Sequence, residues 1–124
     1  MAVKLLIVDD EPKIRWMLTA CLESPDLEIA AASSGSEALT IISQAHPQLM
    51  ILDVKMPGMD GLEVLRQVRV TTPQIGVLFL TGYDDDAIEQ QASQLGALGV
   101  IHKPLVFSEI RQTIQQAIAN LPPV

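Results

Sequence analysis

Short runs of apolar residues alternate along this chain with segments in which apolar residues recur every three or four positions. The runs are rich in leucine and β-branched residues, show little polar alternation and lead into polar residues, which is typical of strands buried on both faces of a parallel sheet. We expect five such strands, at residues 3–8, 27–32, 48–53, 74–80 and 99–102.

The segments between these runs have helical spacing and carry helix boundary signals. Ser34 and Glu37 resemble a capping box, and Asp60 is placed to cap a helix that begins at Gly61. The expected helices run from residue 12 to about residue 24, from 34 to 46, and over 61–70, 84–95 and 107–120. Five strands alternating with five helices predict an α/β fold, a doubly wound five-stranded parallel sheet with helices on both faces.

The stretch from Leu49 to Gly61 is the most informative part of the chain. A run of large apolar residues ends abruptly in the carboxylate of Asp53, so we expect a buried strand that delivers one acid to the rim of the sheet. Behind it, Pro57 and Gly58 supply the fixed φ and the positive φ of a tight turn. The acid is therefore predicted to lie beside a loop of defined shape.

Ligands of open parallel sheets bind at the carboxyl ends of the strands. The polar residues expected at those ends are Asp9, Asp10, Asp53, Thr81 and Lys103. Three carboxylates that converge repel one another unless a cation is present, and Mg²⁺ prefers carboxylate and water oxygens. Asp9 and Asp10 alone would fit a solvated helix N-terminus equally well, but the acid and the lysine on other strands favour a magnesium site.

This set of residues suits nucleophilic attack on phosphorus. Asp53 would become an acyl phosphate, Lys103 and the metal would neutralise the phosphoryl oxygens, and Thr81 would donate a hydrogen bond to one of them. Thr81 or Lys103 taken singly is a weak signal, since such residues are usually structural or solvated. The specificity lies in the combination.

Composition narrows the classes of protein that fit. The 124 residues fit one domain, expected over residues 1–120, with 121–124 as a tail or the start of a linker. Eight Lys and Arg against fifteen Asp and Glu give a net charge of -7, which argues against direct binding to nucleic acid or to a membrane surface. The single cysteine, Cys21, is expected to be a buried thiol, and no apolar run is long enough for a signal peptide or a membrane span. We expect a cytoplasmic protein.

Several motifs in order along nearly the whole chain resemble the receiver domain of two-component response regulators. They are Val8-Asp9-Asp10-Glu11, Asp53 with the loop over 56–61, Thr81-Gly82, Gly96-Ala97 and Lys103-Pro104. The resemblance implies a flavodoxin-like fold in which Asp53 accepts a phosphoryl group from a sensor histidine kinase or a phosphotransfer protein. It also implies that Asp9, Asp10, Asp53 and the backbone carbonyl of Lys55 hold Mg²⁺. Thr81 and Lys103 would contact the phosphoryl oxygens, and the peptide bond between Lys103 and Pro104 would be cis.

One position departs from the family pattern. Val100 stands three residues before Lys103, where the family commonly has a Tyr or Phe whose ring turns inward on activation. We therefore expect activation to depend mainly on the loop over 81–86, with Tyr83 as its aromatic residue. Lys55 and Tyr83 are expected to crowd the path of attacking water and so to prolong the lifetime of the phosphoaspartate.

The expected output surface comprises the fourth helix, fifth strand and fifth helix, which would contact an output domain or a downstream partner. The polar positions of its helices are mostly glutamines with few charges, so a monomer or a weak homodimer is expected. His102 is read as a strand-edge residue, and Arg15 and Trp16 as an outward-facing pair or a partner contact.

Three other kinds of protein fit parts of the pattern. An aspartyl-phosphate phosphatase of the haloacid dehalogenase kind needs a second acid two residues after the nucleophile, where this chain has Lys55. A flavodoxin-like FMN protein needs a phosphate loop after its first strand, where the acids at 9–11 would repel the phosphate. A receiver fold that acts only as a scaffold would not need the full set of acids, hydroxyl and lysine.

Overall fold

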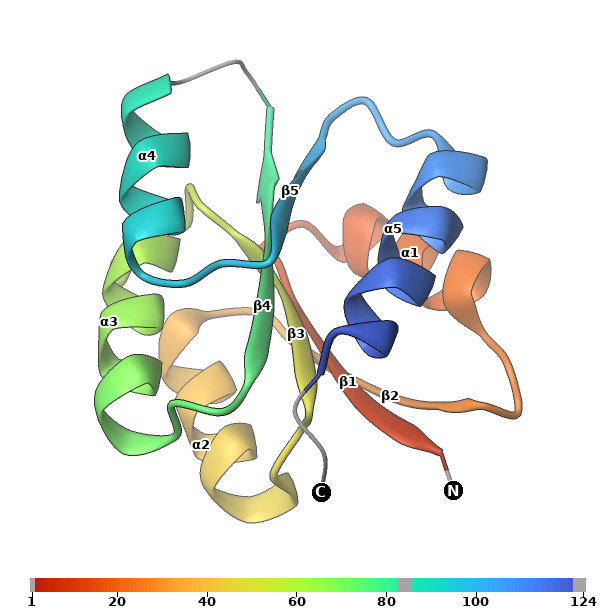
Figure 1. The fold of residues 1–124 in the computed structure, drawn as a ribbon, viewed down its shortest axis with the longest axis horizontal. Helices are drawn as coiled ribbons and strands as arrows, with labels where there is room; N and C mark the ends of the chain where they lie inside the picture. The colour runs from red at the N-terminus through yellow and green to blue at the C-terminus, as the bar shows by residue number, and fades with distance from the viewer. Residues whose placement is uncertain (1, 83–85, 122–124) are drawn as a thin grey trace.

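The computed structural model describes residues 2–82 and 86–121 of the chain. Five parallel strands form one sheet in the order β2-β1-β3-β4-β5, which confirms the predicted architecture (Figure 1). The strands are β1 (Val3–Val8), β2 (Leu27–Ala32), β3 (Leu49–Asp53), β4 (Gly76–Thr81) and β5 (Gly99–His102). The direction in which strands are added reverses between β1 and β3, and their carboxyl ends are where such sheets bind ligands.

Helices cover both faces of the sheet (Figure 1). They are α1 (Pro12–Leu22), α2 (Gly35–Ala45), α3 (Gly61–Thr71), α4 (Asp86–Gln94) and α5 (Phe107–Ala119). The core accordingly has two layers: one packs α2, α3 and α4 against the sheet, and the other packs α1 and α5 against it. No helix in the described part of the chain is long and apolar enough to span a membrane.

The alternation of side chains along β1 shows how one sequence serves both layers. Leu6 and Val8 belong to the α2, α3 and α4 side, whereas Leu5 and Ile7 belong to the α1 and α5 side, and all four are buried. A strand apolar on both faces is stable only in the middle of a covered sheet. The apolar run that identified β1 in the sequence therefore also indicated that it is an interior strand, between β2 and β3.

The predicted elements are present, and in the described part of the chain their ends agree with the observed ones to within two residues; the fourth strand, predicted at 74–80, is Gly76–Thr81. Strands at 3–8, 27–32 and 99–102 match at both ends, and α3 begins at Gly61, where the Asp60 carboxylate accepts a hydrogen bond of 2.9 Å from the Glu63 amide. Ser34 caps α2 in the same way, through the Glu37 amide at 3.1 Å. The fourth helix was predicted from Asp84, and residues 84 and 85 lie outside the described residues, as does the tail over 122–124.

The loop after β3 is held tightly against the strand end. Gly58 has a φ of 80°, which favours glycine. The Gly61 amide donates to the Val54 carbonyl at 2.9 Å, and a Cβ atom at Gly61 would collide with the Asp53 carbonyl oxygen. Only glycine allows the start of α3 to approach the backbone this closely, so the loop fixes the position of Asp53.

Candidate functional site

The five side chains predicted from strand ends all come from the same edge of the sheet. Asp9 and Asp10 follow β1, Asp53 ends β3, Thr81 ends β4, and Lys103 follows β5. Carboxylate oxygens of Asp9, Asp10 and Asp53 lie within 4.8 Å of one another. A hollow of about 470 Å³ opens beside them, lined by Glu11, Asp53, Val54, Lys55, Thr81, Gly82, Lys103 and Pro104.

Lys103 is the cation of this site. Its Nζ lies 3.5 Å from Asp9 Oδ2, 3.6 Å from Glu11 Oε1 and 3.8 Å from Asp53 Oδ2. Its backbone amide donates to the Thr81 carbonyl at 2.8 Å, and the peptide bond to Pro104 is cis, as the resemblance implied. The hydrogen bond to Thr81 holds the backbone of Lys103 beside the end of β4, and its side chain lies among the carboxylates.

Burial changes the proton affinity of these groups. Asp53 is 4% exposed, and burial, reinforced by the neighbouring charge of Asp9, raises its pKa to about 6. Burial likewise raises the pKa of Asp9, which is fully buried. Burial alone would lower the pKa of Lys103, but the carboxylates of Asp53, Asp9 and Glu11 outweigh it and raise that pKa. The site therefore concentrates more negative charge than its lysine balances.

One oxygen atom of the site indicates that a cation is needed to balance this negative charge. Asp9 Oδ1 accepts the Glu11 amide at 2.9 Å and Asp53 Oδ1 accepts the Lys55 amide at 3.2 Å. Asp9 Oδ2 is buried and accepts no hydrogen bond from the described residues. Buried carboxylate oxygens are normally satisfied, and three oxygen donors at this spacing fit a hard divalent cation such as Mg²⁺. The Asp53 contact also brings the Lys55 peptide, the predicted carbonyl ligand, against the acid.

Thr81 is nearly buried, with 6% of its surface exposed, at the carboxyl end of β4. It pairs in register with His102, and the preceding residue, Leu80, accepts the Val54 amide at 3.1 Å. These contacts connect the end of β4 to both the acid-bearing loop and the lysine-bearing strand. A change at Thr81 is thereby linked to both sides of the hollow.

Two residues at this edge were not assigned to the site from the sequence. Glu11 contacts Lys103, and Arg15 donates a 2.8 Å hydrogen bond to the Asp9 carbonyl. The interpretation of Arg15 and Trp16 as an outward pair is therefore wrong for Arg15, although Trp16 is 72% exposed. The sequence signal for both contacts is slight, since charged residues at a helix start are usually solvated.

Other sequence predictions have mixed outcomes at this edge. Val100 packs partly buried against the α2, α3 and α4 layer. His102 is a strand-edge residue as predicted, and its Nε2 lies 2.9 Å from Glu89 Oε1 on α4, a contact that the sequence did not indicate. Tyr83, Asp84 and Asp85 fall outside the described residues, as do the side-chain contacts of Asp86.

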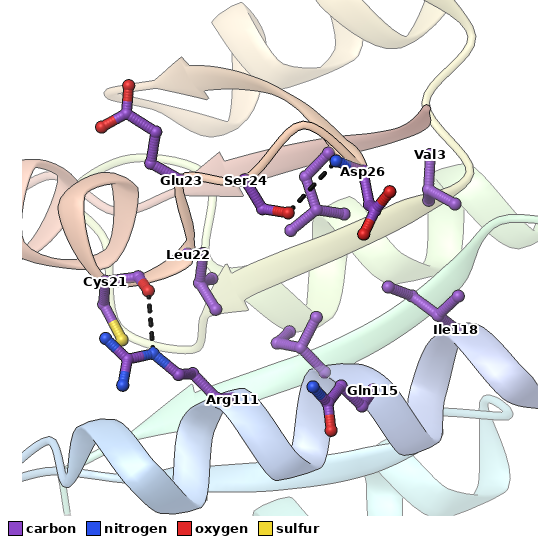
Figure 2. Close-up of a pocket in the computed structure, with 11 residues that line it drawn as sticks. Val3, Cys21, Leu22, Glu23, Ser24, Asp26, Arg111, Gln115 and Ile118 are labelled. Carbon is purple, nitrogen blue, oxygen red and sulfur yellow. Dashed lines mark hydrogen bonds between the residues drawn. The ribbon is translucent and has the colours of Figure 1, made fainter. Parts of the chain in front are cut away.

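A second hollow, of about 490 Å³, lies between the end of α1, the start of β2 and α5 (Figure 2). Arg111 at its rim donates to the Cys21 carbonyl at 3.1 Å, and the Ser24 hydroxyl accepts the Asp26 amide. Its polar groups are thus partly used within the protein, and it holds none of the predicted site residues. Cys21 is a buried free thiol, as predicted.

Comparison with known proteins identifies the family. The response regulator receiver domain matches residues 5–115. Sporulation initiation phosphotransferase F of Bacillus subtilis is 36% identical, over 94% of this chain and 94% of its own length. The DNA-binding transcriptional regulator NtrC of Escherichia coli is 32% identical over 92% of this chain, which spans only 24% of that protein.

The solved structures agree with this assignment. Vibrio cholerae chemotaxis protein CheY4 superimposes with a TM-score of 0.89 at 31% identity, covering 94% of this chain and 99% of CheY4. A response regulator receiver domain protein from Clostridium thermocellum gives a TM-score of 0.87 at 32% identity, with 94% of each chain covered. This chain belongs to the receiver domain family of two-component response regulators.

Proposed function

We propose that this chain is a phosphoacceptor switch in which Asp53 takes a phosphoryl group from a phosphohistidine of a sensor kinase or phosphotransfer protein. One observation carries the proposal: the carboxylate of buried Asp53 lies within 4.8 Å of those of Asp9 and Asp10 and 3.8 Å from the ammonium of Lys103. A carboxylate, a site for a divalent cation and a fixed ammonium are the groups that phosphoryl transfer requires.

The transfer step uses Asp53 as the nucleophile. A carboxylate oxygen forms a bond to phosphorus as the bond between phosphorus and the donor nitrogen breaks. The imidazole keeps the electron pair of the broken bond and takes up a proton, and the product is an acyl phosphate on Asp53. Since only an ionised carboxylate attacks efficiently, a pKa of about 6 leaves Asp53 mostly ionised at neutral pH.

The other residues of the site handle the charge of the phosphoryl group. Asp9, Asp10, Asp53 and the Lys55 carbonyl would hold Mg²⁺, which when bound offsets the negative charge on the phosphoryl oxygens. Lys103 neutralises one of these oxygens, and the Thr81 hydroxyl donates to another. Because Thr81 is tied to β5 and to the Val54 loop, its movement toward the new phosphoryl group changes the surface around β4 and α4.

We place the chain among switches rather than turnover enzymes. The position two residues after Asp53 is Lys55, whose exposed side chain lines the hollow and cannot act as the second acid of a phosphatase. The same side chain stands where water must approach, which supports a phosphoaspartate of moderate or long lifetime. A scaffold that needs no phosphorylation is the second candidate, and only the completeness of the site argues against it.

Signalling from this domain would pass through α4, β5 and α5 to an output domain or a separate partner. The contact between Glu89 on α4 and His102 on β5 links two of these elements. The expected domain limits, 1–120, a cytoplasmic location, and a monomeric or weakly dimeric state are part of the same proposal. NtrC is named a DNA-binding regulator. The net charge of -7 argues against direct DNA binding by this chain itself.

The test is intact mass after incubation with Mg²⁺ and acetyl phosphate. Wild type should gain about 80 Da, one phosphoryl group, and Asp53→Asn should gain nothing. Asp26→Asn, which removes a charge from an exposed acid away from the site, should behave like wild type. An adduct that persists in Asp53→Asn would refute the assignment of the acceptor, and absence of both adduct and Mg²⁺ binding would favour the scaffold.

A further inference from the structure

Glu11 occupies the N-cap position of α1 but does not use its side chain as a cap. Its carbonyl accepts the amides of Ile14 and Arg15, at 3.1 and 3.2 Å, while its carboxylate makes no capping hydrogen bond in the described structure. Short polar side chains at this position normally bond the amides of their own helix. The Glu11 carboxylate instead reaches across the hollow to Lys103, with 3.6 Å between Oε1 and Nζ.

Lys103 has two deeper carboxylate neighbours that already hold it over the site. The side chains of Asp9 and Asp53 are 0% and 6% exposed, whereas that of Glu11 is 59% exposed. Glu11 also stands outside the group of three acids close enough to share a metal ion among the described residues. It therefore adds a negative charge at the mouth of the hollow that lies outside the group of three acids and makes no capping hydrogen bond to α1.

We propose that Glu11 is a positioning residue for Lys103, which it holds at the mouth of the hollow while Asp53 is unphosphorylated. The inference rests on the proposed phosphoacceptor function. To contact a phosphoryl oxygen, the Lys103 ammonium must turn away from Glu11, and an incoming anionic phosphodonor must pass the Glu11 charge. Glu11 thus slows phosphorylation by small anionic donors, while Asp9 and Asp53 suffice to keep Lys103 near the reacting atoms.

The size of the effect follows from exposure. Ion pairs with an exposed partner contribute about 0.2–1 kcal/mol, so removing the Glu11 charge should accelerate phosphorylation by about 1.4- to fivefold. An effect carried by an exposed charge is screened by salt. The acceleration should therefore shrink as the ionic strength rises, which a change of packing would not produce.

The experiment compares the full chain as wild type, Glu11→Gln and Glu11→Asp, with Mg²⁺ and acetyl phosphate, and follows phosphorylation by intact mass. Glu11→Gln should react about 1.4- to fivefold faster at low salt, and Glu11→Asp, which keeps the charge on a shorter side chain, should fall between it and wild type. Glu28→Gln removes an exposed charge from β2 and should leave the rate unchanged.

A second readout needs no phosphodonor. The NMR signal of the Lys103 side chain at fixed pH should shift in Glu11→Gln, because the ammonium loses a neighbour, and should stay in place in Glu28→Gln. An unshifted Lys103 signal, or a Glu11→Gln rate equal to or below that of wild type, would overturn the inference. If wild type accepts no phosphoryl group from any donor, the proposed function fails, whereas the Lys103 signal still decides the role of Glu11.

Discussion

Two cationic side chains, Lys103 and Arg69, lie near opposite ends of β5 and are stabilised in contrasting ways. Lys103 follows β5 and is surrounded by carboxylates, which raise its pKa against the effect of burial. Arg69 extends from α3 toward the segment that precedes β5, and burial lowers its pKa. It makes no ion pair with a carboxylate in the described ranges, but donates to four backbone carbonyls.

The carbonyls that Arg69 contacts belong to two segments that are far apart in the sequence, one before β4 and one after α4. Its guanidinium bonds Leu95 at 2.6 Å, Ile75 at 2.7 Å, Pro73 at 3.0 Å and Gly96 at 3.1 Å. These residues include the C-terminus of α4 and the approach to β4. The end of α4 is further closed by hydrogen bonds that the Gly96 and Ala97 amides donate to the carbonyls of Ser93 and Ala92, with Gly96 at a φ of 80°.

The two regions differ in that the hydrogen bonds of Arg69 are a fixed part of the fold, whereas the charges around Lys103 must rearrange during function. Backbone carbonyls need hydrogen-bond donors in every state of the folded protein, and the rigid guanidinium of Arg69 provides several N–H donors in one plane. The carboxylates around Lys103 repel one another and are held together at a cost in stability until a cation binds. The end of the sheet that carries Arg69 should therefore be stabilised by this side chain. The end that carries Asp9, Asp10 and Asp53 should be destabilised by the repulsion between its carboxylates.

The largest expected effect is at Arg69. Arg69→Ala should lower the free energy of unfolding by about 3 kcal/mol, because several carbonyls lose their donor at once, and the high helix propensity of alanine works against the loss. Arg69→Lys keeps the charge but lacks the planar group, and should recover only part of the stability. Urea unfolding followed by circular dichroism measures both variants.

An Arg69→Lys variant as stable as wild type would show that charge alone suffices. That result would break the comparison, since it would make Arg69 and Lys103 equivalent point charges. Stability of Arg69→Ala within about 0.5 kcal/mol of wild type, the usual range for surface changes, would show that the four hydrogen bonds contribute little.

The next effect is at Asp53 and has the opposite sign. Its pKa is about 6 in the folded protein and about 3.9 in an unfolded chain. A carboxyl group with a raised pKa contributes stability that is complete below about pH 4 and is lost as the pH rises through about 6. Without metal, Asp53→Asn should therefore be more stable than wild type at pH 7, by about 2–3 kcal/mol.

The pH profile gives this prediction its control. The gain in Asp53→Asn should disappear between pH 6 and pH 4, where wild type regains its proton, and Asp26→Asn, at an exposed site, should show no comparable gain. Added Mg²⁺ should narrow the difference at pH 7 by stabilising wild type. Equal stabilities across this pH range would mean that the acids around Lys103 impose no cost.

The same two regions show which features a sequence reveals. The acidic end was predictable because its residues follow apolar runs, and topology brings the ends of parallel strands together. The loop after Asp53 was predictable from Pro57, Gly58 and Gly61, which few other structures require together. The strand limits at 3–8 and 99–102 were also correct, and a charged residue, Asp9 or Lys103, follows each of these runs.

The hydrogen bonds of Arg69, in contrast, could not be predicted from the sequence. Arg69 and Leu95 are 26 residues apart, and a bond from a side chain to a backbone carbonyl depends on no particular residue at the accepting position. Two contacts at the start of α1 were also missed. Glu11 reaches Lys103, which is far away in the sequence, and Arg15 reaches back six residues to the Asp9 carbonyl. Periodicity reports which face of an element is buried, and it does not report where long polar side chains reach.

The smallest expected effect tests whether any arginine on α3 would behave like Arg69. Arg66 lies one turn earlier on the same helix and pairs with Glu63 at 3.4 Å, with side chains 52% and 48% exposed. Such pairs stabilise a helix by about 0.2–0.5 kcal/mol, which the helix propensity of alanine offsets. Arg66→Ala should therefore unfold within about 0.5 kcal/mol of wild type in the urea titration used for Arg69→Ala. If Arg66→Ala and Arg69→Ala lose similar amounts of unfolding free energy, positive charge on α3, rather than the four carbonyl contacts, stabilises this end of the sheet. If Arg66→Ala loses little and Arg69→Ala loses much, the four carbonyl contacts account for the difference in stability.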